Sequence, residues 1–409
     1  MRTRHLAPFL IVAASVAFFP LDGAPPPRIV AVGDVHGAEV AFVSILQRAA
    51  LIDNQRRWTG GTAVLVLAGD FMDRGPGDRA VMDLLMTLET QAAAAGGGVH
   101  TLLGNHEVMN LLGENRDVAP EVFQSFADER SESRREEGFK AEAKIRRGQS
   151  LDKAAWLAAH PPGFIEYHEA LKANAPYGRW LRSKPILAEI DGTVFMHAGI
   201  NADFTKDSLE NINRRVRREL TEWDDAVRWL EQRDLALPFF KLSEIVAAAG
   251  AELTRLKEKR KRETFSDDDV TITQILMPIV SVGSSSLLSP EGPLWFRGYS
   301  TWTDEEGTGR MAALLKKYKV KRFVTGHTPQ LPGQITTRFG GALFLIDTGM
   351  LDGRFFPGGR PSALEIVGDA ATPLYVENAS APIGSRAPVP SSVNSRIRTA
   401  PSPVPRALR

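Results

Sequence analysis

Short apolar runs that end in glycine recur near the start of the chain. Each run is rich in valine, leucine or alanine, and a polar residue follows its last glycine. The three runs are RIVAVGD (28–34), TAVLVLAGD (62–70) and VHTLLGN (99–105). Continuous apolar runs of this length are typical of strands that are buried on both faces. The pattern predicts three buried strands, with Asp34, Asp70 and Asn105 just beyond their apolar parts.

Apolar residues at helical spacing separate these strands. They lie three and four positions apart, at Val40, Val43, Leu46 and Ala50 and again at Val81, Leu84, Leu85 and Leu88. Alternation of strand and helix is typical of parallel βαβ units and therefore of an α/β fold. Because open α/β sheets place ligands beyond the carboxyl ends of their strands, we expect the three polar residues to converge there.

The strand pattern returns in the second half of the chain. It is found in ILAEIDGTVFMHAG (186–199), RFVTGHT (322–328) and ALFLIDTGM (342–350). Two polar segments with a helical pattern interrupt the strands, at residues of about 113–180 and 203–288. We predict one domain over residues 28–375, in which these two segments are helical insertions.

The two ends of the chain differ from this domain. Arg2 and Arg4 precede an apolar stretch, which predicts a signal peptide or an uncleaved N-terminal anchor over residues 1–24. We therefore expect the protein to be exported to the periplasm or the cell exterior, with membrane contact only through an uncleaved leader. Residues 379–409 are rich in proline, serine and arginine, which predicts a disordered tail.

Composition and charge exclude several kinds of site. The chain has no cysteine, so disulfides, zinc–thiolate sites and thiol catalysis are excluded. The tail carries five arginines and no acid, and the leader carries a net charge of +1. Because the whole chain also has a net charge of +1, residues 25–378 carry −5. A nucleic-acid-binding domain would carry a basic surplus, and we expect no nucleic-acid partner.

Five glycine-flanked motifs carry four of the eight histidines of the chain. The motifs are GDVHG (33–37), GDFMDRG (69–75), GNHE (104–107), MHAG (196–199) and TGHT (325–328). GNHE alone would be a turn with a satisfied histidine more often than a ligand. Five such motifs at strand ends favour a site for divalent metals, because carboxylate, imidazole and amide oxygens are suitable donors. Six donors suit two metals that share a bridging ligand.

These motifs resemble those of the calcineurin-like metallophosphoesterases, in particular the phosphoprotein phosphatase branch. Four longer segments are most similar to the Shewanella-like protein phosphatases: GNHEVMNLLG (104–113), YGRWLRSKP (177–185), GPLWFRGY (292–299) and IDTGM (346–350). The resemblance covers residues of about 28–370. It implies a metallophosphatase β-sandwich flanked by helices. The alanine of MHAG, Ala198, is a small departure from the glycine that the family often has there.

The resemblance also implies a role for individual residues. It identifies Asp34, His36, Asp70, Asn105, His197 and His327 as ligands of two divalent metals, with Asp70 as the bridge. His106 matches the general acid of the family and Asp73 its carboxylate partner. Arg74 matches a phosphate-clamping arginine, and Asn105 is a further expected phosphate contact. The family expectation for the metals is manganese, or iron with zinc.

Two such metals would activate a bridging hydroxide for in-line attack on phosphorus, without a phosphoenzyme. We therefore expect a phosphomonoesterase that acts on phosphoproteins, and the subfamily likeness adds a preference for phosphotyrosine. Hydrolysis of a dinucleoside polyphosphate or another small phosphodiester is the alternative. A catalytically dead binding protein is disfavoured, because every motif position is filled. The sequence leaves the oligomeric state open.

Several other residues have two interpretations. Arg297 is either a second phosphate contact or part of a structural salt bridge, and Asp347 is a candidate support for a ligand histidine. Aromatic residues that either line the substrate entrance or belong to the core are Trp295, Tyr299 and Trp302. Histidines expected to be ordinary surface or core residues are His100, His160 and His168.

Overall fold

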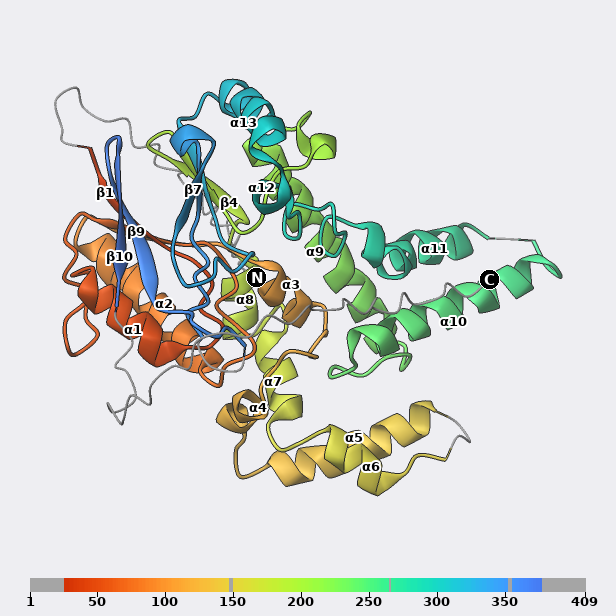
Figure 1. The fold of residues 1–409 in the computed structure, drawn as a ribbon. Helices are drawn as coiled ribbons and strands as arrows, with labels where there is room; N and C mark the ends of the chain where they lie inside the picture. The colour runs from red at the N-terminus through yellow and green to blue at the C-terminus, as the bar shows by residue number, and fades with distance from the viewer. Residues whose placement is uncertain (1–25, 147–149, 265, 352–354, 377–409) are drawn as a thin grey trace, which may run out of the picture. The chain divides into compact units, whose positions relative to one another are not determined.

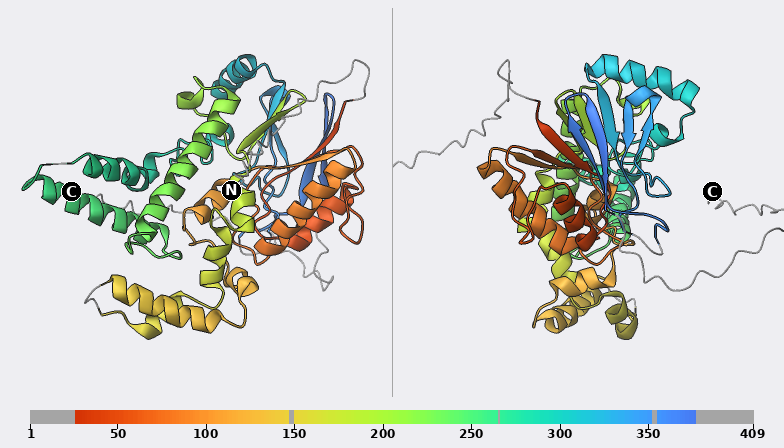
Figure 2. Two further views of the ribbon diagram at one scale, coloured as in Figure 1. Left: turned by 180° about the vertical axis from the view of Figure 1, so that it is seen from behind. Right: turned by 60° about the vertical axis from the view of Figure 1, so that its left-hand side comes forward.

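The computed structural model describes residues 26–146, 150–264, 266–351 and 355–376. The predicted leader and tail, residues 1–24 and 379–409, lie outside these ranges. Within the described part, two mixed five-stranded sheets face one another, and helices pack on their outer faces (Figures 1 and 2). The predicted α/β fold, a β-sandwich flanked by helices, is confirmed.

The first sheet has the order β10-β9-β1-β2-β3. Its strands are β1 (Arg28–Val32), β2 (Val64–Leu67), β3 (Gly98–Thr101), β9 (Ser362–Val367) and β10 (Ala370–Tyr375). Strands β1, β2 and β3 are parallel neighbours, whereas β9 runs antiparallel to both β1 and β10. The three strands predicted from the start of the chain therefore end at one edge of the sheet.

The second sheet has the order β4-β5-β6-β8-β7. Its strands are β4 (Leu187–Ile190), β5 (Thr193–Met196), β6 (Arg322–Thr325), β7 (Thr336–Arg338) and β8 (Leu343–Leu345). Strands β5, β6 and β8 are parallel, with antiparallel β4 and β7 at the edges. Each of the three strand patterns predicted in the second half gives at least one strand.

The parallel strands β1, β2, β5, β6 and β8 are largely buried on both faces, as their apolar sequences predict. The same prediction is wrong for β3, which lies at the edge of the first sheet and exposes His100. On β1, Ile29 and Ala31 pack between the two sheets, where they join Phe195 of β5 and Val324 of β6. The alternate residues of β1 face the helices instead. Helices α1 (Glu39–Arg48) and α2 (Asp78–Ala94) cover this outer face (Figure 1).

The predicted helix faces are only partly correct. Val81, Leu84, Leu85 and Leu88 of α2 are all buried. On α1, Val43 and Leu46 are buried as predicted, together with Phe42 and Ile45, whereas Val40 is 75% exposed. The predicted period placed Val40 on the buried face, but this residue lies at the start of the helix and faces solvent.

The two polar segments between the strand patterns contain most of the remaining helices. Helix α3 (Asn105–Leu111) precedes the first segment, which holds α4 (Pro120–Phe126), α5 (Ser131–Ile145), α6 (Lys153–Ala159), α7 (Phe164–Leu171) and α8 (Pro176–Arg182). The second segment holds α9 (Leu209–Glu231), α10 (Leu242–Arg260) and α11 (Asp267–Val280). The short α12 (Gly298–Thr301) and α13 (Asp304–Tyr318) follow. Among the described residues, no helix combines the length and the apolar character of a membrane span.

Candidate metal centre

The six predicted metal ligands lie where parallel strands end. Asp34 and His36 follow β1, Asp70 follows β2, Asn105 opens α3 after β3, His197 follows β5 and His327 follows β6. All six residues are buried, with exposed fractions of 5% or less. Two facing sheets therefore deliver donors to one buried cluster. The assignment of these residues as ligands remains a prediction, and their proximity is the geometry that it requires.

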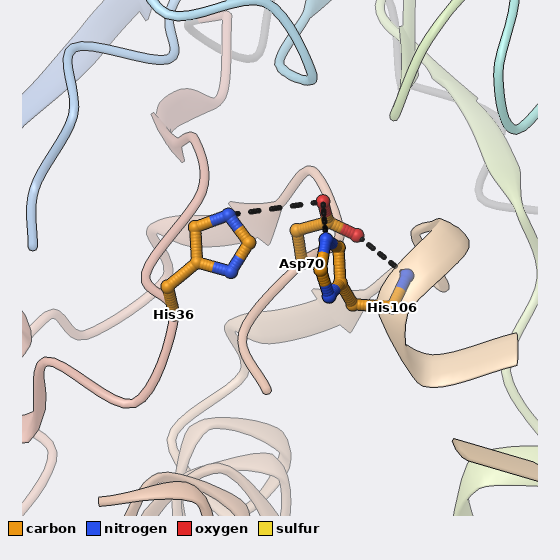
Figure 3. Close-up of side chains that lie close together, drawn as sticks. All are labelled: His36, Asp70 and His106. Atoms are coloured by element: carbon orange, nitrogen blue, oxygen red, sulfur yellow. Dashed lines mark hydrogen bonds and ion pairs between the residues drawn. The ribbon is translucent and has the colours of Figure 1, made fainter. Parts of the chain in front are cut away.

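Asp70 lies at the centre of the cluster. Its Oδ2 is 3.2 Å from His197 Nε2, 3.8 Å from His106 Nε2 and 3.9 Å from His36 Nε2. Figure 3 shows the imidazoles of His36 and His106 directed at the Asp70 carboxylate. One group of three potential ligands consists of His36, Asp70 and His106, and a second consists of Asp70, His197 and His327. Asp70 alone belongs to both groups, which is the position that a bridging carboxylate needs.

The second group includes the amide of Asn105. His197 Nε2 is 2.9 Å from Asn105 Oδ1 and 3.0 Å from His327 Nδ1. The Asn105 amide nitrogen points away, 3.8 Å from Met109 Sδ. The groups that face one another are therefore lone-pair donors, and such an arrangement is suited to a cation.

Backbone carbonyls orient the three histidines of the predicted ligand set. The pairs are His36 Nδ1 with Met72 O, His197 Nδ1 with Ala68 O and His327 Nε2 with Trp295 O, each at 3.0 Å. The nitrogen that makes this bond is the donor, so the other nitrogen carries the lone pair that a metal ligand needs. Burial lowers the pKa of His36 and of His327 well below 6.5, which favours the neutral imidazole that binds metals.

The prediction that Asp347 supports a ligand histidine is wrong, because the carbonyls already fill that position at all three histidines. Asp347 follows β8, and its Oδ1 accepts a hydrogen bond from the Gly349 amide at 2.9 Å. Its side chain lies against Asp34 instead. Burial, followed by the charges around it, raises the pKa of Asp347 to about 6.

A chain of hydrogen bonds holds the predicted general acid, His106. Its Nδ1 is 2.7 Å from Asp73 Oδ2, and Asp73 is fully buried. Asn110 Nδ2 donates to Asp73 Oδ1 at 2.8 Å, and the Tyr167 hydroxyl donates to Asn110 Oδ1 at 2.7 Å. Burial disfavours the charged imidazole, but Asp70 and Asp73 outweigh it and raise the pKa of His106. A raised pKa keeps His106 protonated closer to neutral pH, as an acid requires.

Sequence reasoning gave no role to Glu107, yet this residue organises the turn that carries Asp70. Its carboxylate accepts from the backbone amides of Asp70, Phe71, Met72 and Gly104 at 2.7–3.0 Å. Gly104 allows this close approach, because a Cβ there would lie 2.2 Å from Asp70 Oδ1. The available signal was a glutamate at the third position of a helix, where it can cap the helix start.

The two candidate phosphate-binding arginines lie at the edge of the cluster. Arg74 Nη1 contacts His36 Nε2, and the guanidinium stacks 5.5 Å from the centre of the Phe356 ring. Arg297 Nη1 donates to the carbonyl of His327 and to the hydroxyl of Thr328, both at 2.9 Å. No carboxylate of the described residues lies within ion-pair distance of Arg297, which removes the support for the salt-bridge interpretation.

An open pocket of about 550 Å³ lies beside Arg74, and Arg116 and Phe355 also line it. Tyr299, by contrast, is 2% exposed and belongs to the core, whereas Trp295 and Trp302 are half-buried.

Among the described residues, the three histidines outside the cluster contact none of the predicted ligands. His160 and His168 are buried in the first helical segment, and His100 is exposed on β3.

Comparisons with known proteins give a consistent match. A family model described as calcineurin-like phosphoesterase matches residues 27–331. The uncharacterized protein C1840.07c of Schizosaccharomyces pombe is 29% identical over 328 residues, which are 80% of this chain and 74% of that protein. Shewanella-like protein phosphatase 2 of Arabidopsis thaliana is 32% identical over 200 residues, 47% of this chain and 51% of that protein. Shewanella-like protein phosphatase 1 of Plasmodium berghei is 24% identical over 326 residues, 79% of this chain and 67% of that protein.

A solved structure shares the fold. The cold-active protein-tyrosine phosphatase of a psychrophilic Shewanella species matches with a TM-score of 0.52 at 22% sequence identity. The match covers 85% of this chain and 80% of that chain. At this level of identity, the likeness concerns the fold alone.

Proposed function

The chain belongs to the calcineurin-like phosphoesterase family and is a hydrolase of phosphoester bonds, and from this premise we propose that it is a metal-dependent phosphomonoesterase of phosphorylated proteins. The observation that carries the proposal is the junction of two groups of potential ligands at Asp70, next to the His106–Asp73 pair. The names of the Arabidopsis and Plasmodium relatives support a phosphoprotein as the substrate.

Asp34, His36, Asp70, Asn105, His197 and His327 would hold the two ions. A pair of divalent ions supplies Lewis-acid activation of water and of the phosphoryl group. We propose manganese, or iron with zinc, as the ions. The donor set of imidazole, carboxylate and amide oxygen is compatible with each of them.

The chain itself binds and orients the phosphate. The guanidinium of Arg74 lies next to His36, and the guanidinium of Arg297 lies next to His327. A guanidinium offers paired N–H donors that match two phosphate oxygens. With one arginine near each group of ligands, the phosphate would be held from two sides. Asn105 would be a further polar contact in the same space.

His106 would give its proton to the leaving oxygen of the substrate. The Asp73 carboxylate, 2.7 Å from Nδ1, fixes the ring so that Nε2 faces the cluster. The same carboxylate stabilises the imidazolium before the transfer. Asn110 of α3 and Tyr167 of α7 keep Asp73 in place, so buried groups from two helices and from the loop after β2 position the acid.

A substrate panel tests this proposal. Metal-stripped protein is reloaded with Mn²⁺ and assayed on phosphoserine, phosphothreonine and phosphotyrosine peptides, on nitrophenyl phosphate and on its bis ester. We expect turnover of the monoesters only after reloading, with phosphotyrosine preferred. Asp70→Asn, which removes the shared carboxylate, should lose most activity. Hydrolysis of the bis ester or of a dinucleoside polyphosphate in preference to every monoester would overturn the proposal in favour of the alternative substrate class.

We further propose that the protein is exported, on the basis of the N-terminal residues alone. N-terminal sequencing of the mature protein from fractionated cells tests this. A protein that retains Met1 in the cytosolic fraction would contradict it.

A further inference from the structure

Two buried carboxylates from different sheets meet beside the predicted ligands. Asp34 follows β1 of the first sheet and Asp347 follows β8 of the second, and their side chains lie close enough for the charge of each to act on the other. Asp34 is 3% exposed and Asp347 is 1% exposed. Gly33 allows this approach of the two strand ends, because a Cβ there would lie only 2.5 Å from the carbonyl oxygen of Ile346.

One oxygen of Asp347 has no protein partner. Oδ1 accepts from the Gly349 amide at 2.9 Å, but Oδ2 is buried and, among the described residues, no group donates a hydrogen bond to it. Asp34, in contrast, accepts from the His327 amide at 3.0 and 3.2 Å. A buried carboxylate oxygen without a donor is costly, so its partner is expected to be a group other than protein.

The charges around this pair make a cation the suitable partner. Asp70 is a third buried carboxylate, and its negative charge acts on both Asp34 and Asp347. The positive charge of Arg74 acts on Asp34 in the opposite direction. Neighbouring carboxylates in a buried cluster persist only when positive charge or protons compensate them. The predicted ions would lie in this cluster.

We propose that Asp347 is a further metal-holding residue, which supplies a third carboxylate to the ion predicted to be held by Asp34 and His36, directly or through one water molecule. The inference rests on the proposed function, because it assumes that the centre binds metal. It adds a residue that lies outside the predicted six ligands. Its motif, IDTGM (346–350), would then be part of the metal centre rather than a structural loop.

A third carboxylate would also change the charge that a substrate meets. Two divalent ions with Asp34 and Asp70 alone leave a surplus of two positive charges, whereas Asp347 reduces this surplus to one. Asp347 would therefore favour retention of the ions and weaken the attraction for a phosphate dianion. Affinity for the metal and affinity for inorganic phosphate should change in opposite directions when Asp347 loses its charge.

Metal titration of the full chain tests the inference. Metal-stripped wild type and Asp347→Asn are titrated with MnCl₂ in a calorimeter, and the ions retained after gel filtration are counted by mass spectrometry. We expect two ions in the wild type. In Asp347→Asn we expect the Kd of one ion to rise by about 10- to 100-fold and that of the other to change little. Inorganic phosphate should bind the fully loaded variant more tightly than the loaded wild type.

Asp78 offers a matched control. It is also fully buried, and its Oδ1 also has no hydrogen-bond donor among the described residues. The carboxylates that act on it are Asp73 and Glu107. Its Oδ2 accepts from the Asp73 amide at 2.9 Å, and the side-chain oxygen of asparagine can accept the same bond. Asp78→Asn should therefore leave both Mn²⁺ affinities unchanged. An equal loss in Asp78→Asn and Asp347→Asn would mean that any buried aspartate affects the centre, and would overturn the inference.

Other outcomes are equally decisive. Wild-type affinity for both ions in Asp347→Asn would show that a shared proton, and not a metal, compensates the pair. If Asp347→Asn fails to fold, Asp347→Ser is titrated in its place. If neither variant folds with saturating Mn²⁺, Asp347 has a structural role only. A wild-type protein that binds two ions but hydrolyses no phosphoester would overturn the proposed function and leave this inference intact.

Discussion

The clearest prediction concerns His106 and the chemistry of the leaving group. His106→Asn removes the proposed acid, and Asp73→Asn removes the carboxylate that lies 2.7 Å from its Nδ1. A serine alkoxide is a poor leaving group and needs a proton. A tyrosine phenolate, with a pKa of roughly 10, needs it less, and nitrophenolate needs it least. The loss of activity should therefore decrease along this series.

The size of each loss follows from what is removed. General acid catalysis accounts for about 10²–10⁴-fold when the proton is required, which is about 3–5 kcal/mol of barrier. We expect this loss for His106→Asn on a phosphoserine peptide. Asp73→Asn keeps the imidazole and removes one buried hydrogen bond to its charged form, which contributes about 1.5–3 kcal/mol. The corresponding loss is about 10- to 150-fold.

Asp73→Asn should also change the pH dependence. The acid works only when protonated, so kcat on phosphoserine should fall as the pH rises through the pKa of His106. Burial opposes the charged ring, and Asp70 and Asp73 together raise the pKa above its ordinary value of 6.5. Without the Asp73 charge, this pKa should decrease. The alkaline limb of the kcat profile is therefore expected at lower pH in Asp73→Asn than in the wild type.

The assay is single-turnover hydrolysis at saturating Mn²⁺, with metal content measured for every variant. His100→Asn changes an exposed histidine and serves as the control, with no expected effect. His106 also belongs to one group of potential ligands, so its loss could act through the metal instead. Equal losses on all three leaving groups, together with a loss of bound metal, would refute the acid assignment.

Three further predictions concern stability and binding. Burial lowers the pKa of His168 from 6.5 to about 3, so only the unfolded chain takes up this proton at pH 5. His168 should therefore contribute about 2 kcal/mol to the fall in the free energy of unfolding between pH 8 and pH 5, and urea titrations should show that His168→Phe reduces this fall by that amount. Glu107→Gln leaves two of the four backbone amides without an acceptor, and each unpaired amide costs about 1–3 kcal/mol of stability. This variant should bind Mn²⁺ more weakly in calorimetry, whereas the control Glu142→Gln on α5 should bind it as the wild type does. Arg297→Ala should raise KM for phosphopeptides and the Kd of inorganic phosphate without changing metal content, and unchanged phosphate binding would contradict its role.

The convergence of these side chains could be predicted from the sequence because the residues follow strong local patterns. The apolar runs before Asp34, Asp70 and Asn105 indicate buried strands, and parallel strands end at one edge. His197 and His327 follow the same rule in the second sheet. The edge strands were less visible. β7 is short and polar, and β10 is mostly exposed and contains Pro373, so neither has the signal of a buried strand.

The supporting residues could not be found in this way. Asn110 and Tyr167 are 57 positions apart, and nothing local relates them to Asp73. Glu107 matters because it accepts from four amides, three of which belong to a turn that begins 37 positions earlier. A sequence pattern indicates where a strand ends. It does not indicate which backbone amides are then left without a partner.

The backbone conformation of the site explains why its side chains could be predicted and its supporting residues could not. His36, Asp70, Asp73, Arg74 and His327 all have positive φ, between 49° and 72°, although none is glycine. Such conformations cost on the order of 1–3 kcal/mol each and persist only where surrounding contacts impose them. At the Asp70 turn these contacts are the Glu107 hydrogen bonds, together with those from the amides of residues 35 and 36 to the Asp70 carbonyl at 2.9 and 3.0 Å. The side chains that conduct the proposed chemistry can be read from motifs, but their geometry is maintained by buried main-chain bonds. Substitutions that weaken those bonds should therefore reduce metal affinity before they unfold the sandwich.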